Sequence, residues 1–259
     1  MDRNNIEKIA RTPEDKLLLA KIYDKISNGI RKNIPANTAF LSQREQELSR
    51  FLVGNTEGIL FHGGYEDAQR KMLIYLPEYL DPQDEDNYPF MCLRAKFYEE
   101  DHPTHRDFLG ALIGCGIARE CIGDICVGAN SCDFFVTAEI APYILQNFSS
   151  AGRTKLQVEA IPICEAYIPR ENTQTVQDTV ASLRLDNIIS AGFQISRSLA
   201  LTAITTGRVS INGLLCEKPE KQVDCNAIIT VRGFGKFRLT NICGITKKGR
   251  ISVVIDRYI

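Results

Sequence analysis

The chain has 259 residues, of which 44% are hydrophobic and 24% charged, and its formal net charge at pH 7 is −1. This composition excludes a wholly disordered protein, and the length suggests about two domains, with room for three small ones. No apolar run approaches the roughly 20 residues of a membrane span, and the N-terminus lacks signal-peptide features, so we expect a cytoplasmic protein with no membrane partner. Nine cysteines occur without a Cys-x-x-Cys pair, so we expect reduced thiols, no metal site and no cofactor.

Residues 1–80 predict a small α+β domain that begins with a helix. Thr12 followed by Pro13 and two acids is typical of a helix N-terminus, because the proline and the acids suit its free N–H groups. Four apolar residues at four-residue spacing are expected to form the buried stripe of this helix. They are Leu18, Ile22, Ile26 and Ile30.

A second helix and two strands follow in the same region. Ser42 with Glu45 three residues later indicates a capping box for a helix that contains Leu48 and Phe51. Short strands are expected at 59–61 and 71–76, on either side of a Gly63-Gly64 turn and a brief polar helix.

An acidic, proline-bounded stretch then opens a central domain, residues 81–170. The apolar pattern predicts a strand at 90–97, a helix at 105–113, strands at 124–127 and 133–137, a helix at 138–148 and a strand at 155–161. The order β-α-β-β-α-β is the ferredoxin-like arrangement that RNA-recognition (RRM-like) domains share with many other proteins, so it does not by itself indicate a function. The polar segment 169–177 is expected to be a linker.

Positive charge is concentrated in a third domain, residues 178–259. Residues 1–177 carry 19 Lys/Arg and 26 Asp/Glu, a balance of −7, whereas residues 178–259 carry 12 and 6, a balance of +6. Such a division is expected when one module of a chain meets a polyanion such as nucleic acid.

The elements of this third domain are small. A short amphipathic helix reaches Gly192-Phe193, and a second helix begins after the N-cap Ser196 and ends at Gly207. A strand at 209–211, an Asn212-Gly213 hairpin turn and a returning strand at 214–215 follow, and a later strand is expected at 228–231.

Residues 183–237 resemble an S4 (αL-like) RNA-binding domain. The family pattern runs Arg-Leu-Asp, then Ser-Arg before a helix, then Gly-x-Val-x-Ile-Asn-Gly, and later a strand that ends Val-Arg. Twelve residues match it in order: Arg184, Leu185, Asp186, Ser196, Arg197, Gly207, Val209, Ile211, Asn212, Gly213, Val231 and Arg232.

Further motifs along nearly the whole chain are similar to those of the bacterial YlmH family. They are 62–68 (HGGYEDA), 70–73 (RKML), 105–110 (HRDFLG), 119–120 (RE), 122–124 (IGD), 232–237 (RGFGKF) and 246–250 (TKKGR). The resemblance implies an N-terminal domain, an RRM-like domain and an S4 domain. It also implies binding to rRNA and tRNA of the large ribosomal subunit, quality control of stalled subunits that hold peptidyl-tRNA, and a gene neighbourhood concerned with cell division. We expect a monomer.

Two positions depart from the S4 pattern. The second helix usually carries Lys or Arg, but residues 198–205 have none, so fewer phosphates would be held there. Cys225-Asn226 replaces the usual Gly-Asp turn, and the turn should survive because Asn tolerates the left-handed conformation.

The residues expected to contact RNA are basic or polar and belong to the third domain. Arginine can hold two phosphate oxygens at once, and a helix N-terminus offers free N–H groups. The hypothesis depends on Arg184, Arg197 and Arg208, whose guanidinium groups are expected to be unpaired and to lie on one face. The full set is Arg184, Ser196, Arg197, Arg208, Asn212, Lys218, Lys221, Arg232, Lys236, Lys247, Lys248 and Arg250.

Two alternatives stay open beside a non-catalytic RNA-binding protein. One is an RNA-modifying enzyme whose active site lies in the first 170 residues. Pseudouridine synthases also combine S4 domains with an Arg-Leu-Asp, but here the triplet lies inside the S4 pattern, so Asp186 is expected to be structural. The other is a cell-division interaction factor that uses the acidic N-terminal half.

Overall fold

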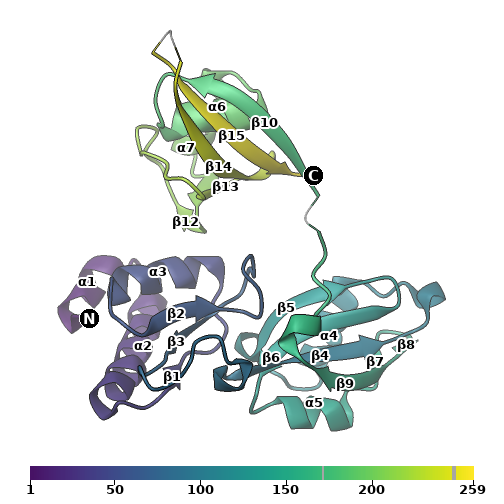
Figure 1. Cartoon of the computed structure of the whole chain (residues 1–259). Coiled ribbons are helices and arrows are strands. Elements are labelled where there is room, and N and C mark those ends of the chain that lie inside the picture. The colour runs from purple at the N-terminus through teal and green to yellow at the C-terminus, as the bar shows by residue number, and fades with distance from the viewer. Residues whose placement is uncertain (171, 247–248) are drawn as a thin grey trace. The chain divides into compact units, whose positions relative to one another are not determined.

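The computed structural model describes residues 1–170, 172–246 and 249–259, and it divides the chain into two compact units (Figure 1). The first unit is Met1–Pro169 and the second is Arg170–Ile259. Together they form the mixed α+β fold that the sequence predicts. Each unit is described by itself.

The N-terminal part of the first unit is a three-stranded sheet with helices. The predicted helix start at Thr12 and the predicted capping box at Ser42 are both present, and Thr12 forms a capping box as well. Thr12 and Asp15 cap one helix, and Ser42 and Glu45 cap the next. The sheet order is β1-β3-β2, all antiparallel. The elements are α1 (Ile6–Ile9), α2 (Pro13–Lys32), β1 (Ala36–Asn37), α3 (Gln43–Val53), β2 (Ile59–His62) and β3 (Met72–Tyr75).

The buried stripe of α2 differs from the predicted one. Leu19, Ile22 and Ile26 are buried, whereas Leu18 and Ile30 are only half-buried. Each four-residue step on an α-helix rotates the side chain by about 40°, so a strict four-residue spacing drifts off one face, and alternating steps of three and four stay on it.

Helix α3 contains Leu48 and Phe51, as predicted; Phe51 is 58% exposed, whereas its neighbour Leu52 is buried. The brief helix predicted before β3 is wrong. No helix lies between β2 and β3 in this described part of the chain; a turn joins them, and Gly64 adopts a positive φ of 102°. A Cβ at Gly64 would stand 2.0 Å from the Phe135 ring, so this position requires glycine both for its backbone conformation and for space.

The central part of the first unit has the predicted ferredoxin-like topology. Its four strands are antiparallel in the order β5-β6-β4-β9, and the helices α4 and α5 connect them in a β-α-β-β-α-β sequence. Helix α5 is shorter than expected and has a proline in its first turn. The elements are β4 (Phe90–Lys96), α4 (His105–Gly114), β5 (Ile122–Val127), β6 (Ser131–Thr137), α5 (Ala141–Asn147), β7 (Ser150–Ala151), β8 (Thr154–Lys155) and β9 (Gln157–Ile161).

Both faces of this four-stranded sheet are covered. On one face Leu93 and Phe134 belong to a core that includes residues of α4 and α5. On the other face Phe90, Cys92 and Phe135 share a core with residues of the N-terminal sheet such as Met72. The two sheets of the first unit therefore share one hydrophobic core.

The second unit is a six-stranded antiparallel sheet with two helices, in the order β10-β15-β14-β13-β11-β12 (Figure 1). Helices α6 and α7 contribute Ile188, Ala200 and Ile204 to its core, which also contains Phe237 and Val253 of the sheet. The elements are β10 (Thr173–Val180), α6 (Leu185–Phe193), α7 (Arg197–Thr205), β11 (Val209–Ile211), β12 (Leu214–Leu215), β13 (Ile228–Val231), β14 (Gly235–Ile245) and β15 (Ile251–Tyr258).

The predicted linker at 169–177 is wrong for most of its length, because residues 173–177 form the first part of β10. This strand pairs with β15 along its whole length but lies at the edge of the sheet, and most of its side chains face solvent. A polar edge strand is held by main-chain hydrogen bonds and leaves no hydrophobic alternation in the sequence.

Within the described residues, no single helix has both the length and the apolar composition to cross a membrane. Helices α6 and α7 have the required length and apolar composition only when they are taken together, and the pair is bent by 119°.

Candidate nucleic-acid interface

A buried carboxylate at the start of α6 joins two of the predicted arginines. The Asp186 side chain is 3% exposed and accepts hydrogen bonds from the Arg184 Nε at 3.1 Å and Nη2 at 3.3 Å. The Arg197 Nε and Nη2, at the first residue of α7, donate to Asp186 Oδ2 at 3.1 and 2.8 Å. One carboxylate thus holds the first turns of both helices together.

This geometry corrects the expectation of unpaired guanidinium groups at Arg184 and Arg197. Each guanidinium has five N–H donors and uses two of them on Asp186, so three remain on each. The side chains of Arg184 and Arg197 are still 36% and 60% exposed. Arg184, Asp186 and Arg197 together carry a net charge of +1, which is less than two unpaired arginines would carry. Asp186 nevertheless fixes the orientation of both guanidinium groups.

Asp186 is ionised under ordinary conditions. Burial acts to raise its pKa, but the hydrogen bonds from Arg184 and then Arg197 outweigh burial and leave the pKa below its usual value. A carboxylate with a lowered pKa stabilises the folded state above its unfolded-state pKa of about 4 and loses that contribution as the pH falls below it.

We therefore expect the D186N variant to be less stable than the parent protein at pH 7 and for the difference to shrink on acidification. Urea unfolding at pH 7 and at about pH 3, followed by circular dichroism, measures it. A difference that stays constant over this range would show that the ion pairs do not contribute through the charge of Asp186.

A loop brings Lys218 and Lys221 to the start of α6. The Leu185 N–H donates to the Lys221 carbonyl at 2.9 Å, and the Asp186 N–H donates to the Pro219 carbonyl at 3.2 Å. Both lysines are exposed. Their main chain therefore lies directly beside the turn that carries Arg184.

Arg208 and Arg232 lie next to each other at the other end of α7. The Arg232 N–H donates to the Arg208 carbonyl at 2.9 Å, and both side chains are exposed. The Arg208 Nε also donates to Thr206 Oγ1 at 3.1 Å, which leaves the rest of its fork for other acceptors. These basic residues form two groups, Arg184, Arg197, Lys218 and Lys221 at the starts of α6 and α7 and Arg208 and Arg232 beyond the end of α7, and we use the name basic surface for both groups together.

Ser196 and Asn212 have structural roles in this surface. Ser196 caps α7, accepting a hydrogen bond from the Leu199 N–H at 3.3 Å. Asn212 adopts a left-handed conformation in the hairpin turn, with φ of 49°, and its Oδ1 accepts the Ile228 N–H at 2.9 Å. Neither position therefore needs a ligand to explain its residue.

Lys236 lies on the opposite face of the sheet from the helices. Its neighbour Phe237 is fully buried in the core with α6, and successive side chains of a strand point to opposite faces. The Lys236 Nζ stands 4.0 Å from the Tyr258 ring centroid. Phe237 is therefore a core residue, and Phe234 also packs against that core.

Arg250 lies directly before β15. Its Nε donates to Thr179 Oγ1 at 3.0 Å and its Nη2 donates to the Thr179 carbonyl, so the side chain is anchored to β10. Lys247 and Lys248 lie outside the described residues.

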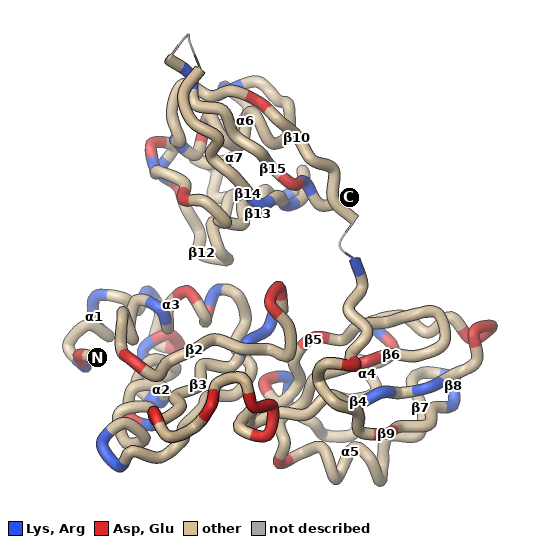
Figure 2. Tube along the Cα trace, in the orientation of Figure 1, with Lys and Arg blue, Asp and Glu red and all other residues tan. Residues whose placement is uncertain are grey.

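The sequence did not reveal that Asp186 anchors two arginines at once. Its only signal is the Arg-x-Asp spacing at the start of α6, since Arg197 is 11 residues away. Figure 2 shows the charged residues along the chain, with Asp and Glu gathered in the loop before β4 in the first unit. In the described residues no three His, Cys, Asp or Glu come together to hold a metal ion.

Comparison with known proteins follows the same division of the chain. Residues 92–165 match the family described as "Putative RNA-binding domain in YlmH", and residues 183–229 match the S4 domain family. The chain is 32% identical over 222 residues to the ribosome-associated protein quality control protein P2 of Bacillus subtilis, covering 85% of this chain and 86% of that protein. It is also similar to the structure of the cell division protein ylmH from Streptococcus pneumoniae, with 21% identity, a TM-score of 0.49, and coverage of 62% of this chain and 98% of the other. The matched domains and the extent of the Bacillus similarity show that this chain belongs to the YlmH family of S4-domain RNA-binding proteins.

Proposed function

We propose that the basic surface binds structured RNA on the large ribosomal subunit, either rRNA or the tRNA of a stalled peptidyl-tRNA complex. The protein would act there as a non-catalytic monomer in ribosome-associated quality control. An S4 surface reads the shape and charge of folded RNA, because the deep groove of A-form RNA hides base edges from side chains.

One observation is the main support for this proposal: the guanidinium groups of two arginines are held by a single buried carboxylate. Asp186 takes two N–H groups from each of Arg184 and Arg197 and leaves the others exposed. A side chain already fixed in position loses less entropy when it meets a phosphate. The first turn of α7 adds backbone N–H groups beside Arg197.

The ribosome as the place of action is supported by the name of the Bacillus relative, a ribosome-associated protein quality control protein. The state of Asp186 argues against a pseudouridine-synthase-like role for the Arg-Leu-Asp triplet. In the Arg-Leu-Asp of a pseudouridine synthase the aspartate must reach its substrate, whereas Asp186 is nearly inaccessible and accepts bonds from both neighbouring arginines.

Co-sedimentation with ribosomal subunits tests the proposal. We expect the purified protein to migrate with the large subunit in a sucrose gradient, and to do so less as the salt concentration rises, because phosphate contacts release counterions. Crosslinks from Lys218 and Lys221 should map to RNA. Migration with the small subunit alone, or a new modified nucleoside after incubation with bulk RNA, would contradict the proposal.

A further inference from the structure

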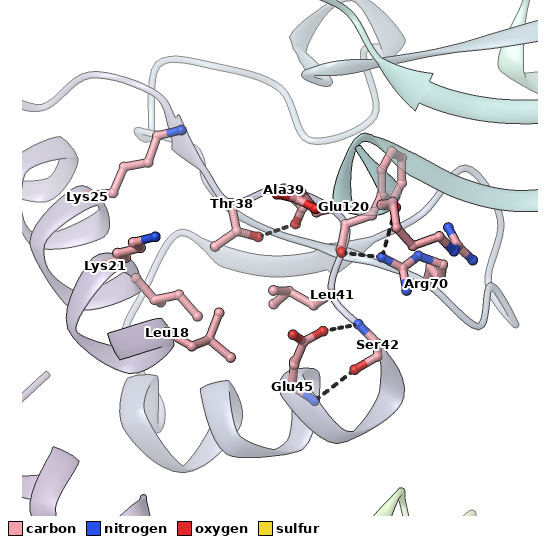
Figure 3. Close-up of a pocket in the computed structure, with 13 residues that line it drawn as sticks. Leu18, Lys21, Lys25, Thr38, Ala39, Leu41, Ser42, Glu45, Arg70 and Glu120 are labelled. Atoms are coloured by element: carbon pink, nitrogen blue, oxygen red, sulfur yellow. Dashed lines mark hydrogen bonds between the residues drawn. The ribbon is translucent and has the colours of Figure 1, made fainter. Parts of the chain in front are cut away.

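The first unit contains a pocket that the proposed function does not use. It has a volume of about 680 Å³ and lies among α2, the segment from Thr38 to Ser42 and Arg119-Glu120 (Figure 3). Sites for small ligands typically have volumes of roughly 300 to 1,000 Å³. The pocket is therefore large enough for a ligand of nucleotide size.

Apolar side chains form one wall of this pocket. Leu18 and Ile22 come from α2, and Leu41 comes from the segment that leads to α3. Ile22 and Leu41 are 3% exposed each and form the fixed base of this wall, and the half-buried Leu18 is the most accessible of the three. This wall suits a flat, weakly polar group such as a base.

Two lysines stand at the rim without a carboxylate partner. Lys21 and Lys25 are one turn apart on α2. Figure 3 shows them at the left of the pocket, across from Arg70 and Glu120 at the right. In the part of the chain that the structure describes, neither forms an ion pair, although the same helix pairs Lys16 with Glu7 and Asp24 with Arg3. Like charges four residues apart destabilise a helix slightly, so this pair has no role in the stability of α2.

Two arginines add positive charge from the other side. Arg70 donates to the carbonyls of Phe40 at 2.7 Å and Ile122 at 2.9 Å, and Arg119 donates to the Ile122 carbonyl at 2.6 Å. The acceptors are neutral, and burial lowers the pKa of both arginines. The carboxylates of Glu45, Asp124 and Glu120 act on Arg70, and Asp124 also acts on Arg119, so the positive charge of the two arginines is partly offset.

The pocket has fewer negative groups than positive ones. Its lining includes two carboxylates, Glu45 and Glu120, against four cations. Glu45 already accepts the Ser42 N–H at 2.7 Å in the capping box of α3. The lining side chains alone sum to +2, and Asp124 beside the two arginines offsets part of that charge, so Lys21 and Lys25 are the main cationic groups of the pocket.

We propose that this pocket binds a nucleotide, with its phosphate at Lys21 and Lys25 and its base against the apolar wall of Leu18, Ile22 and Leu41. The same chemistry is offered by a free mononucleotide and by the terminal nucleotide of an RNA strand. The site is independent of the basic surface, since it lies in the other unit.

Binding of fluorescent methylanthraniloyl-AMP to the full-length protein tests this, with inorganic phosphate and an RNA pentanucleotide as competitors. We expect saturable binding that weakens at least about tenfold in K21Q/K25Q, because charge-assisted hydrogen bonds to phosphate are strong. The matched control K8Q/K32Q removes the same charge from exposed lysines outside the pocket and should bind like the parent protein.

The competitors distinguish the two sources. Stronger competition by the pentanucleotide than by unlabelled AMP assigns the pocket to an RNA terminus, and the reverse assigns it to a free nucleotide. No saturable binding at millimolar AMP, or equal affinity in K21Q/K25Q and the parent, would overturn the inference. K21Q/K25Q should still bind ribosomal subunits, so failure here is distinguishable from failure of the proposed function.

Discussion

The R197Q/R208Q variant is expected to bind structured RNA about a hundredfold more weakly than the parent protein. Each arginine can make charge-assisted hydrogen bonds to phosphate, worth about 1.5 kcal/mol or more, and each 1.4 kcal/mol changes the affinity tenfold. Glutamine is preferable to glutamate, because a carboxylate at position 197 would repel Asp186, which Arg197 contacts at 2.8 Å. Filter binding to ribosomal RNA over a series of salt concentrations measures the effect.

The salt dependence gives a second readout of the same variant. Each lost phosphate contact should lower the slope of log K against log salt by roughly one unit. R106Q/R153Q is the matched control, since it removes two exposed arginines from the first unit. If both double variants lost affinity equally, net charge and not the basic surface would explain the binding.

The D133N variant should lose about 3 to 5 kcal/mol of stability, as expected when one partner of a buried ion pair is removed. Asp133 of β6 is fully buried and accepts the Arg94 Nε at 2.8 Å, the Arg94 Nη2 at 2.6 Å and the Tyr167 N–H at 2.6 Å. An amide cannot accept all three bonds and leaves the Arg94 charge unpaired. Urea unfolding of the full-length protein, followed by circular dichroism, measures the loss.

The same sheet offers a control for this effect. Glu159 of β9 pairs with Lys96 of β4 at 2.6 Å, but both side chains are about half exposed. An exposed pair of this kind contributes less than about 1 kcal/mol, so E159Q should unfold close to the parent protein. Equal losses in D133N and E159Q would show that burial of Asp133 has no special energetic weight.

Local signals in the sequence predicted local structure well. The helix start at Thr12, the capping box at Ser42 and the turn at Asn212-Gly213 depend on residues within three positions of one another, and the structure has all of them. The ferredoxin-like topology was also predictable, because its strands and helices alternate in a known order.

What the sequence did not predict depends on contacts between distant residues. Arg184 and Arg197 share Asp186 only because the turn between α6 and α7 brings their first turns together. The edge strand β10 is polar and has no periodic signal of its own. The candidate pocket combines residues from α2, the segment before α3 and position 119, none of which forms a motif.

The sequence of β4 indicates that both faces of the four-stranded sheet are covered, although the order of helices and strands alone does not. Strand β4 reads Phe-Met-Cys-Leu-Arg-Ala-Lys, with apolar residues at both odd and even positions. Such a run indicates a strand buried on both faces, whereas a half-open sheet alternates. The composition of β4 alone therefore argued against an open face.

That covering limits how the central domain can handle nucleic acid. RNA-recognition domains stack unpaired bases on aromatic rings that their sheets present to solvent, but here Phe90 and Phe135 are sealed beneath the N-terminal sheet. Any RNA that reaches residues 92–165 would meet helices, connecting loops and strand edges. It would touch sugars and phosphates there, and the sheet itself would offer no aromatic platform for stacking bases unless the first 80 residues moved away.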